Sequence, residues 1–388
     1  MQILIELVAG LGAAVWVGLW AFPGQPWRAR PRLEADSEMA GADLSDITAV
    51  IPARDEAPYI GTALASLAAQ GEGLAIVVVD DHSRDGTAEA ARAAGEAELA
   101  VVPGEPLPEG WSGKVWALEQ GRARTWGRYL LLMDADIEMA PGMLAVLRDR
   151  LEHEGAGLVS LMAALRTEGK WERLLILPFL FFFRVLYPFD RVSRRDSRVA
   201  AAAGGCLLLD RQALEDAGGF APLRSAVIDD CALARRIKDQ GYPLWLGLTR
   251  SVRSLRPYQR LGEVWAMVAR TAFTQLGYSA ALLGLATLAM AAVFWGPSLG
   301  LVWGVFGGQF TWAIGGALGI LAMAAVYSPT LAFYGRSRWW SLTLPLAGTL
   351  FLAMTWTSAW RYWRGVRSRW KGRTYGRSVT GPSAEGDR

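Results

Sequence analysis

Apolar and polar positions repeat with a regular period through the middle of the chain. Four short apolar runs, at residues 48–52, 74–79, 99–102 and 130–137, have the length and composition of buried strands. Between them, apolar residues recur at the spacing of amphipathic helices. Strands that alternate with helices in this way are typical of an α/β domain with a mostly parallel, doubly wound sheet.

The same alternation continues beyond residue 140, although less regularly. We predict helices at 141–151, from 229 onward and at 261–276, and strands at 157–162 and 242–248. Residues 199–209, with Gly204-Gly205 in the middle, are expected to belong to the same domain. Together with the first half, these elements predict one large α/β domain over residues 47–276.

The first segment of the chain is apolar enough to cross a membrane. Residues 3–22 carry a single charged side chain, Glu6, and arginines follow at positions 28, 30 and 32. A run of this length spans a bilayer, and the arginines mark its cytoplasmic side. A cleaved signal peptide is the competing interpretation, but no basic segment precedes the apolar core. We therefore predict a retained anchor over 1–24 and a linker over 25–46.

The C-terminal part of the chain is also membrane-like. Two uncharged runs, at 278–295 and 299–327, are separated by Gly296-Pro297 and predict a helical hairpin. A third apolar run covers 341–360. We therefore predict transmembrane helices within residues 277–360.

A basic tail, residues 361–388, follows these helices and is expected in the cytoplasm. Four spans would place this tail outside, against the tendency of basic residues to stay inside. Either the last apolar run is re-entrant or interfacial, or one stretch spans differently from this count.

One aromatic segment lies inside the α/β domain. Residues 171–189 are strongly apolar but are interrupted by Arg173, Pro178 and Arg184, which favours an interfacial helix over a span. Four arginines between positions 191 and 198 come next and are suited to lipid headgroups or phosphates. We therefore treat residues 171–198 as an interfacial apolar and basic segment of the domain.

Composition narrows the chemistry that the chain can perform. Of 388 residues, 52% are hydrophobic, and the net charge of +3 gives no global electrostatic case for nucleic acid binding. Two cysteines argue against a disulfide scaffold. With two histidines in the chain, a Ser-His-Asp triad is disfavoured, and a catalytic base is expected to be a carboxylate.

Acidic residues occur at or near four strand ends. They are Asp55-Glu56, Asp80-Asp81, Asp134 with Asp136, and Asp229-Asp230. In an open α/β sheet the crevice beyond the strand tips is where ligands bind, so these acids are expected to share one site. Asp134 and Asp136, one residue apart after an apolar run, suit Mg²⁺ or Mn²⁺ that holds a diphosphate. Each pair alone is also compatible with a helix cap or a solvated turn.

These motifs, in this order, resemble the family 2 glycosyltransferases, which have the GT-A nucleotide-diphospho-sugar transferase fold. Residues 50–56 read Val-Ile-Pro-Ala-Arg-Asp-Glu, similar to V-I-P-x-x-N-E, and residues 78–87 are similar to V-V-D-D-x-S-x-D-G-T. Asp134-Ala135-Asp136 matches D-x-D, and Asp229-Asp230 stands where the family has an acid pair. The resemblance covers about residues 46–275.

Two further stretches, 110–117 and 370–375, resemble the membrane-bound hopanoid-associated subgroup. That subgroup is related to ceramide glucosyltransferases and carotenoid glycosyltransferases. The resemblance implies a membrane enzyme and leaves the acceptor to be identified.

The resemblance also implies a role for each candidate residue. Asp81 would accept a hydrogen bond from uracil in a nucleoside pocket, and Lys114 and Arg270 would contact the donor's phosphates. Asp136, helped by Asp134, would hold the divalent metal. The other residues implied in the nucleotide-sugar site are Pro52, Arg54, Asp55, Glu56 and Asp80.

For the chemistry itself, the resemblance implies that Asp230 is the general base, which takes the acceptor's proton in a direct, inverting displacement. Asp229 would tune the pKa of that base. One motif departs from the family: where many members have Q/R-x-x-R-W, residues 267–271 keep only Arg270. The missing tryptophan disfavours processive polymer synthesis.

We therefore predict a glycosyltransferase of the bacterial inner membrane with a cytoplasmic GT-A domain. It would move a sugar from a nucleotide-sugar, UDP-linked, to a lipid hydroxyl or lipid phosphate, and the link to hopanoids comes from the resemblance alone. A polyprenyl-phosphate glycosyltransferase is the nearer alternative, with the arginines at 191–198 binding the acceptor's phosphate. A non-catalytic membrane scaffold is the other, and the intact acid motifs disfavour it.

Overall fold

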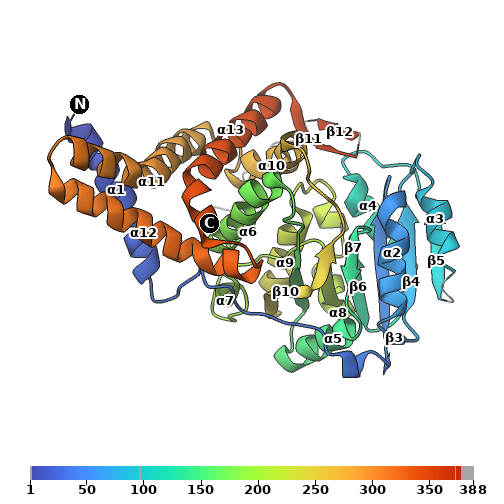
Figure 1. Ribbon diagram of the computed structural model, residues 1–388. Helices are drawn as coiled ribbons and strands as arrows, with labels where there is room; N and C mark the ends of the chain where they lie inside the picture. The colour runs from blue at the N-terminus through green and yellow to red at the C-terminus, as the bar shows by residue number, and fades with distance from the viewer. Residues whose placement is uncertain (1, 96–97, 372, 377–388) are drawn as a thin grey trace, which may run out of the picture.

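Eight strands form the central sheet of the computed structural model (Figure 1), which describes residues 2–95, 98–371 and 373–376. They are β2 (Ile47–Ala53), β4 (Ala75–Asp80), β5 (Leu99–Pro103), β6 (Tyr129–Met133), β7 (Ile137–Met139), β8 (Leu158–Ala164), β9 (Cys206–Asp210) and β10 (Leu244–Ser254). Their order across the sheet is β5-β4-β2-β6-β9-β8-β10-β7.

Most neighbouring strands in this sheet run parallel. β5, β4, β2 and β6 form one parallel set, and β8 and β10 pair in parallel. β9 is antiparallel to both β6 and β8, and β7 is antiparallel to β10. The predicted α/β fold with a mostly parallel sheet is therefore confirmed.

Helices cover both faces of the sheet. One face carries α2 (Ala57–Ala68), α3 (Thr87–Ala93) and α5 (Met143–Glu154), and the other carries α4 (Gly113–Arg122), α8 (Arg211–Asp216) and α9 (Asp229–Asp239). Successive residues of a strand point to opposite faces, so Val50 of β2 packs in one apolar core and Ala49 and Ile51 pack in the other. This two-sided burial explains why the parallel strands read as continuous apolar runs.

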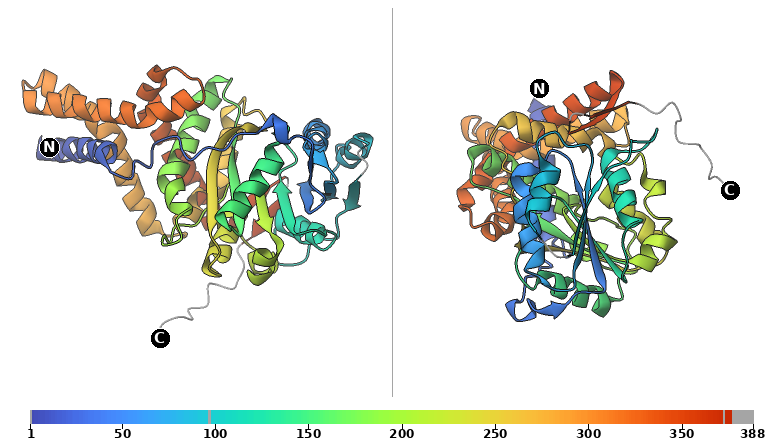
Figure 2. Two further views of the ribbon diagram at one scale, coloured as in Figure 1. Left: turned by 90° about the horizontal axis from the view of Figure 1, so that it is seen from below. Right: turned by 90° about the vertical axis from the view of Figure 1, so that its right-hand side faces the viewer.

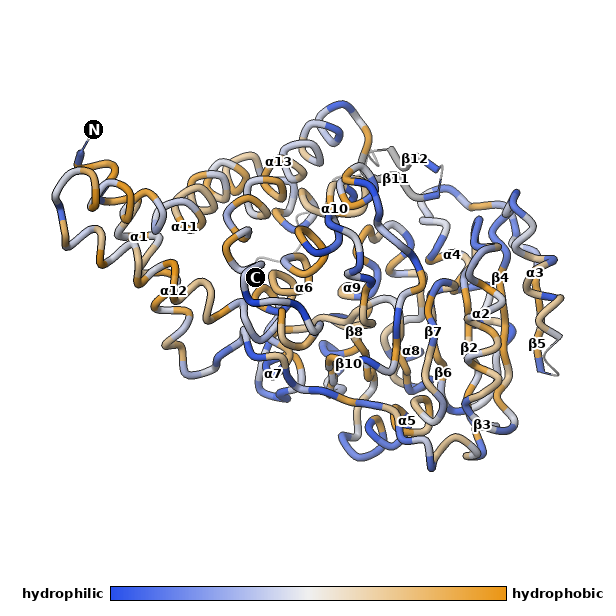
Figure 3. Tube along the Cα trace, viewed as in Figure 1, coloured by the Kyte–Doolittle hydropathy of each residue, from blue (hydrophilic) through white to orange (hydrophobic). Residues whose placement is uncertain are grey.

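Three long apolar helices project from this domain (Figures 1 and 2). They are α1 (Gln2–Ala21), α11 (Ala280–Phe306) and α12 (Phe310–Phe333). With the segment Arg338–Trp363, the described chain has four helices long and apolar enough to cross a membrane. Figure 3 shows the hydrophobic colouring of the projecting helices and the mixed colouring of the sheet domain.

The predicted hairpin is present, but its turn lies elsewhere. α11 continues through Gly296 and Pro297, and the chain turns at Gly307-Gly308, where Gly308 has a φ of +66°. The small residues at 296–297 lie against α1, because a Cβ at Gly12 would meet the Ala292 carbonyl oxygen and the Pro297 ring. The prediction of a turn at Gly296-Pro297 was wrong, since in this bundle a proline and a glycine serve close helix packing.

The segment at 171–198 folds as short helices on the sheet domain. A π-helical turn, η2 (Glu172–Ile176), leads into α6 (Leu177–Leu186), and α7 (Phe189–Val192) follows. Leu175, Leu180 and Phe181 are buried. α6 is too short to cross a bilayer, in agreement with the prediction that this segment does not span.

The last part of the chain returns to the sheet domain. After α10 (Leu261–Gln275), the apolar hairpin and η4 (Arg338–Thr343), helix α13 (Leu344–Trp363) lies across α10 and α11. It leads into a two-stranded hairpin, β11 (Val366–Trp370) and β12 (Arg373–Gly376). Of the basic tail predicted at 361–388, residues 372 and 377–388 lie outside the described residues.

Residues 25–46, predicted as a linker, follow the surface of the domain. Leu33 donates its backbone N–H to the Leu248 carbonyl, and the Glu34 carboxylate accepts hydrogen bonds from Thr249, Arg250 and Ser251. The short elements η1 (Ser37–Met39), β1 (Ala42–Asp43), β3 (Gly71–Glu72) and η3 (Ala221–Leu223) complete the fold.

Candidate active site

A large cavity opens beyond the carboxyl ends of β2 and β6. It has a volume of about 1540 Å³. Eight residues singled out in the sequence line it: Pro52, Glu56, Lys114, Asp134, Asp136, Asp229, Asp230 and Arg270. Glu56 follows β2 and Asp134 follows β6, its parallel neighbour, so the edge of the sheet brings them together.

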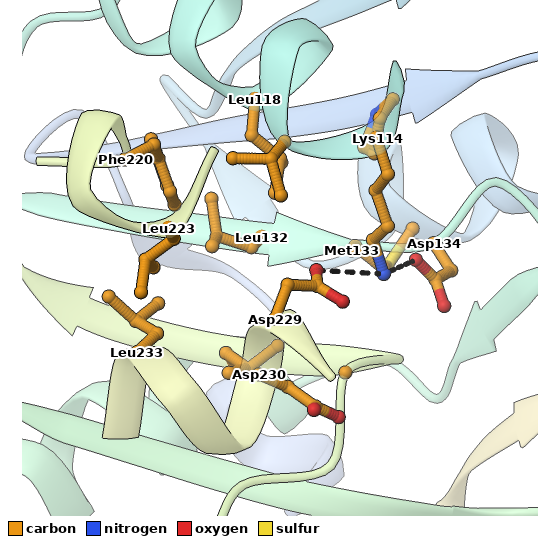
Figure 4. Close-up of a pocket in the computed structure, with 14 residues that line it drawn as sticks. Lys114, Leu118, Leu132, Met133, Asp134, Phe220, Leu223, Asp229, Asp230 and Leu233 are labelled. Atoms are coloured by element: carbon orange, nitrogen blue, oxygen red, sulfur yellow. Dashed lines mark ion pairs between the residues drawn. The ribbon is translucent and has the colours of Figure 1, made fainter. Parts of the chain in front are cut away.

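Lys114 connects two of these acids. It lies in the first turn of α4, and its Nζ is 2.7 Å from Asp134 Oδ1 and 3.9 Å from Asp229 Oδ2 (Figure 4). Burial alone would lower the pKa of Lys114, but the carboxylates of Asp134 and Asp229 raise it above its usual range. Lys114 is therefore a fixed positive charge at the centre of the acid cluster.

Asp230 begins α9 together with Asp229 and has different surroundings. Its Oδ1 accepts the backbone N–H of Cys231 at 2.7 Å, and the backbone of Gly204 also donates to it. Burial, followed by the charge of Asp229, raises the pKa of Asp230 to about 6, against the opposing effect of Lys114. A carboxylate with this pKa is ionised at neutral pH and can still accept a proton readily.

Arg256 neutralises the acids on the other side of the cavity. Its Nε donates to Asp136 Oδ2 at 3.0 Å, and its second terminal nitrogen, NH2, donates to Glu56 Oε1 at 2.6 Å. Ser254 Oγ donates to the same Asp136 oxygen at 3.2 Å. Asp136 and Glu56 are thus held by one guanidinium at the end of β10.

The acid pair at 134 and 136 fits a divalent metal only in part. Its hard carboxylate oxygens are the type of ligand that Mg²⁺ and Mn²⁺ prefer. Within the described ranges, however, no group of three or more His, Cys, Asp or Glu side chains is arranged to hold a metal ion. One or two carboxylates completed by substrate phosphates and water are a usual Mg²⁺ site, so the residues fit a metal that arrives with a diphosphate.

Asp81, which was predicted to bind the nucleoside, follows β4 and is contacted by the C-terminal hairpin. Asp81, whose side chain is 3% exposed, is 2.7 Å from the Arg373 guanidinium, and Arg54 donates to its backbone oxygen. Lys371 in the hairpin turn lies 2.8 Å from Glu56 and lines the cavity. Burial raises the pKa values of Asp81 and Glu56 although these cations lower them.

Asp55 and Asp80 act within the loops rather than in the cavity wall. Asp55 accepts the backbone N–H of Arg84 at 2.9 Å, and Asp80 accepts that of Ser83 at 3.3 Å. The Asp55 backbone N–H in turn donates to Ser83 Oγ. These bonds tie the loop after β2 to the loop after β4, and Arg54, Asp55, Asp80 and Asp81 are absent from the residues that line the cavity.

Arg270 presents a cation to the cavity from α10. Its Nε is buried and has no hydrogen-bond partner among the described residues. Tyr258 lies close enough to Asp136, Arg256 and Arg270 for all three charges to influence its pKa, which burial raises. Arg270 therefore belongs to the charged end of the cavity.

The far end of the cavity is apolar. Phe182 of α6 packs edge-on against Phe294 of α11 at 5.7 Å and against Phe351 of α13 at 5.3 Å between ring centroids. All three rings line the same cavity as the acid cluster. A polar ligand and an apolar one can therefore meet inside one space.

Three charged residues of this site were missed in the sequence. Arg256 was missed because β10 was predicted to end at 248, whereas it runs to Ser254 and places Arg256 just beyond the strand. Lys371 and Arg373 belong to the stretch 370–375, which was read as a mark of the subgroup and given no role. The available signal was the pair of basic residues, Lys371 and Arg373, two positions apart in that stretch.

The sequence comparisons agree with the motifs. Residues 48–218 match the sequence model of the family described as Glycosyl transferase family 2. Over 131 residues the chain is 32% identical to 4,4'-diaponeurosporenoate glycosyltransferase of Staphylococcus haemolyticus (strain JCSC1435). This alignment covers 33% of the chain and 35% of the relative, so the chain spans about a third of that relative's length.

The fold is similar to that of a mannosyltransferase from Pyrobaculum calidifontis, solved in complex with GDP-Man and Mn²⁺. The TM-score is 0.54 at 20% sequence identity, over 92% of this chain and 98% of that one. At this identity the similarity establishes the fold alone. Residues 48–218 are therefore similar in sequence to glycosyl transferase family 2, and the domain that contains them has the GT-A fold.

Proposed function

We propose that the chain is a membrane-bound glycosyltransferase that moves a hexosyl group, with inversion, from a nucleotide-sugar to a lipid acceptor. One observation carries this proposal: a single cavity is lined by the acid cluster at the sheet edge and by phenyl rings from α6, α11 and α13. A charged donor and an apolar acceptor both find suitable surroundings there.

The charged end of the cavity suits a nucleoside diphosphate. Lys114, Arg256, Arg270 and Lys371 line it beside the carboxylates. The solved mannosyltransferase of similar fold binds GDP-Man, and the motif around Asp81 favours a UDP-linked donor. We assign the nucleoside to the loops after β2 and β4, with Asp55 and Asp80 holding the shape of that pocket.

A divalent metal would be held by Asp136 and Asp134, and it would neutralise charge on the diphosphate. Mn²⁺ in the structure of the similar mannosyltransferase supports this assignment. In this structure Lys114 binds the carboxylate of Asp134, and Arg256 binds that of Asp136. These two cations therefore neutralise the predicted metal ligands when no donor is bound.

The reacting group of this chain is Asp230. It accepts the proton of the acceptor as the acceptor's oxygen attacks the anomeric carbon from the side opposite the diphosphate. Its backbone partners, Cys231 and Gly204, fix one end of the carboxylate. Asp229 raises the pKa of Asp230 and is itself positioned by Lys114.

We further propose that the chain crosses the bacterial inner membrane three times, with α13 lying along the membrane surface. The arginines after α1 and after α12 lie at the domain end of the bundle, and the turn at 307–309 carries no charge, which favours a cytoplasmic domain. α13 contacts the domain at both ends: Leu344 packs with Leu177, and Thr357 and Ser358 bind α10.

This proposed placement would remove the conflict between four spans and a cytoplasmic basic tail. With α13 interfacial, Lys371 and Arg373 lie on the same side of the membrane as Glu56 and Asp81, to which they bind. A role in hopanoid biosynthesis is supported by the resemblance at 110–117 and 370–375.

Nucleotide binding tests the donor half of the proposal. We expect purified full-length protein in detergent to bind UDP with Mn²⁺, as measured by calorimetry, and Asp136→Asn to weaken binding at least about tenfold. Asp196→Asn is the matched control, because Asp196 pairs with Arg194 on an exposed surface. Equal binding by Asp136→Asn would remove the metal assignment, and no binding of any nucleotide would favour the scaffold alternative.

A further inference from the structure

We infer that the acceptor is a lipid that presents a neutral hydroxyl group, and not a lipid phosphate or carboxylate. This inference rests on the proposed function and names the substrate class of the same site. It concerns the end of the cavity lined by α6, α11 and α13, which we call the acceptor chamber.

The acceptor chamber is uncharged. None of the described residues that α6, α11 and α13 contribute to the cavity carries a charge, and Phe179, Phe182, Phe183, Phe294 and Phe351 dominate it. Thr355 of α13 is its polar group, and its hydroxyl donates to the Phe351 carbonyl within the helix. An ionised headgroup placed here would lose its hydration without gaining a partner.

The chamber also reaches the surface beside the apolar bundle. Leu186 at the end of α6 lines the cavity and is 58% exposed. α11, which supplies Met290 and Phe294, is one of the candidate membrane spans. A molecule with a long apolar body can therefore keep that body against apolar side chains while its polar end points toward Asp230.

Three of the four cations that line the cavity are paired with carboxylates at the donor end. Lys114 is paired with Asp134, Arg256 with Asp136 and Glu56, and Lys371 with Glu56. Arg270 lies near Tyr258 and Asp136, on the same side. An acceptor phosphate would have to compete with the donor's own diphosphate for these groups.

The arginines at 191–198 do not place a positive charge in the cavity. Arg194 is paired with Asp196, Arg195 donates to the Glu154 carbonyl, and the Arg198 carbonyl accepts from Arg235. None of these arginines is among the residues that line the cavity. The interaction proposed in the sequence for a polyprenyl-phosphate acceptor therefore has no counterpart at this site.

Asp229 and Asp230, which line the same cavity, fit a neutral nucleophile. Asp229 and Asp230 would repel an approaching phosphate or carboxylate, which is already ionised and needs no base. A hydroxyl needs one: its oxygen forms the new bond to the anomeric carbon, and its proton passes to Asp230. The bond from that carbon to the diphosphate oxygen breaks, and its electron pair leaves with the nucleoside diphosphate.

An acceptor competition tests this inference. Membrane lipids of the source organism are separated by anion exchange into neutral and acidic pools, and each is given to the full-length protein with radiolabelled UDP-hexoses and Mn²⁺. We expect label in lipid only with the neutral pool. Label transferred to the acidic pool would overturn the inference, as would no transfer to either pool by protein that binds UDP; protein that binds no nucleotide would overturn the proposed function itself.

A charge placed in the chamber provides a second measurement. Thr355→Glu is expected to lower kcat/KM for the neutral acceptor at least about tenfold while the Kd for UDP stays unchanged. Thr349→Glu is the matched control, because Thr349 is exposed on the same helix and outside the cavity. Equal activity of Thr355→Glu and Thr349→Glu would contradict the assignment of the chamber.

Discussion

Two adjacent carboxylates at the start of α9 have different surroundings. Asp229 points toward Lys114, at 3.9 Å, and belongs to the charged network that also holds Asp134. Asp230 points toward Gly204 and the start of its own helix, where burial raises its pKa to about 6. A carboxylate with this raised pKa is kept ionised at neutral pH at a cost in folding free energy.

That cost gives a prediction at the residue level. The folded pKa of Asp230, about 6, lies above its ordinary value of 3.8, so its contribution to stability is present below pH 4 and is lost as the pH rises through 6. Asp230→Asn should therefore be as stable as wild type near pH 4 and more stable at pH 7.5, by at most about 3 kcal/mol.

Thermal unfolding in detergent across this pH range measures the difference. Asp196→Asn, an exposed substitution of the same type, should show no such gain with rising pH. A destabilised Asp230→Asn at pH 7.5 would contradict the burial of an ionised base.

At the level of elements, the C-terminal hairpin is the part that joins distant segments of the chain. Lys371 and Arg373, at the turn between β11 and β12, contact Glu56 and Asp81, which follow β2 and β4. Arg54 Nε donates a hydrogen bond to the Lys371 carbonyl and so holds the backbone of Lys371 in place. We propose that this hairpin completes the donor site.

Removing one of these charges tests that role. Lys371→Met should weaken UDP binding about tenfold, because a charge-assisted hydrogen bond is worth about 1.5–3 kcal/mol. Arg364→Met is the control, since Arg364 is exposed and contacts the Trp360 ring. Tighter UDP binding by Lys371→Met, measured by calorimetry, would show instead that the hairpin masks the pocket.

Much of this fold and site could be predicted from the sequence, for a physical reason. Buried parallel strands are continuous apolar runs. Asp134 directly follows one such run and Glu56 lies in the loop after another, so their meeting at one sheet edge follows from the topology. Asp230 was placed correctly at the start of α9 because the apolar residues of that helix have a clear helical period.

Other features depend on contacts that a local pattern does not contain. Pro297 is tolerated inside α11 because α1, nearly 300 residues earlier in the chain, packs against that position. Arg256 follows a strand that continues because β7 pairs with its end at Val252 and Arg253. The return of the tail to Asp81 is likewise a tertiary contact between residues 292 positions apart.

At the level of the whole molecule, the number of membrane crossings depends on whether α13 spans the bilayer or lies along its surface. α1, α11 and α12 form a bundle that points away from the sheet (Figure 2), whereas α13 lies across α10 and returns the chain to the active site. In the most apolar 18-residue stretch of each segment, 44% of the residues are buried for Arg338–Trp363, which contains α13, and 17% are buried for α1. α13 therefore offers less apolar surface to lipid than a span at the edge of a bundle would.

Cysteine accessibility tests this three-span topology. In a chain whose Cys206 and Cys231 are replaced by Ser, we expect Gln309→Cys to react with an impermeant maleimide in spheroplasts. Arg364→Cys should react only after the membrane is permeabilised, because it lies on the side of the domain. Labelling of both positions in intact spheroplasts would mean that α13 crosses the membrane.

The most direct test of the whole account is UDP release by the detergent-solubilised protein, given a panel of UDP-sugars and a bacterial lipid extract, with and without Mn²⁺. We predict release that needs lipid and Mn²⁺, that falls on the acidic side of a pH near 6, and that drops by about 10²–10⁴-fold in Asp230→Asn. Release that persists unchanged in Asp230→Asn, or that needs no lipid, would contradict the account.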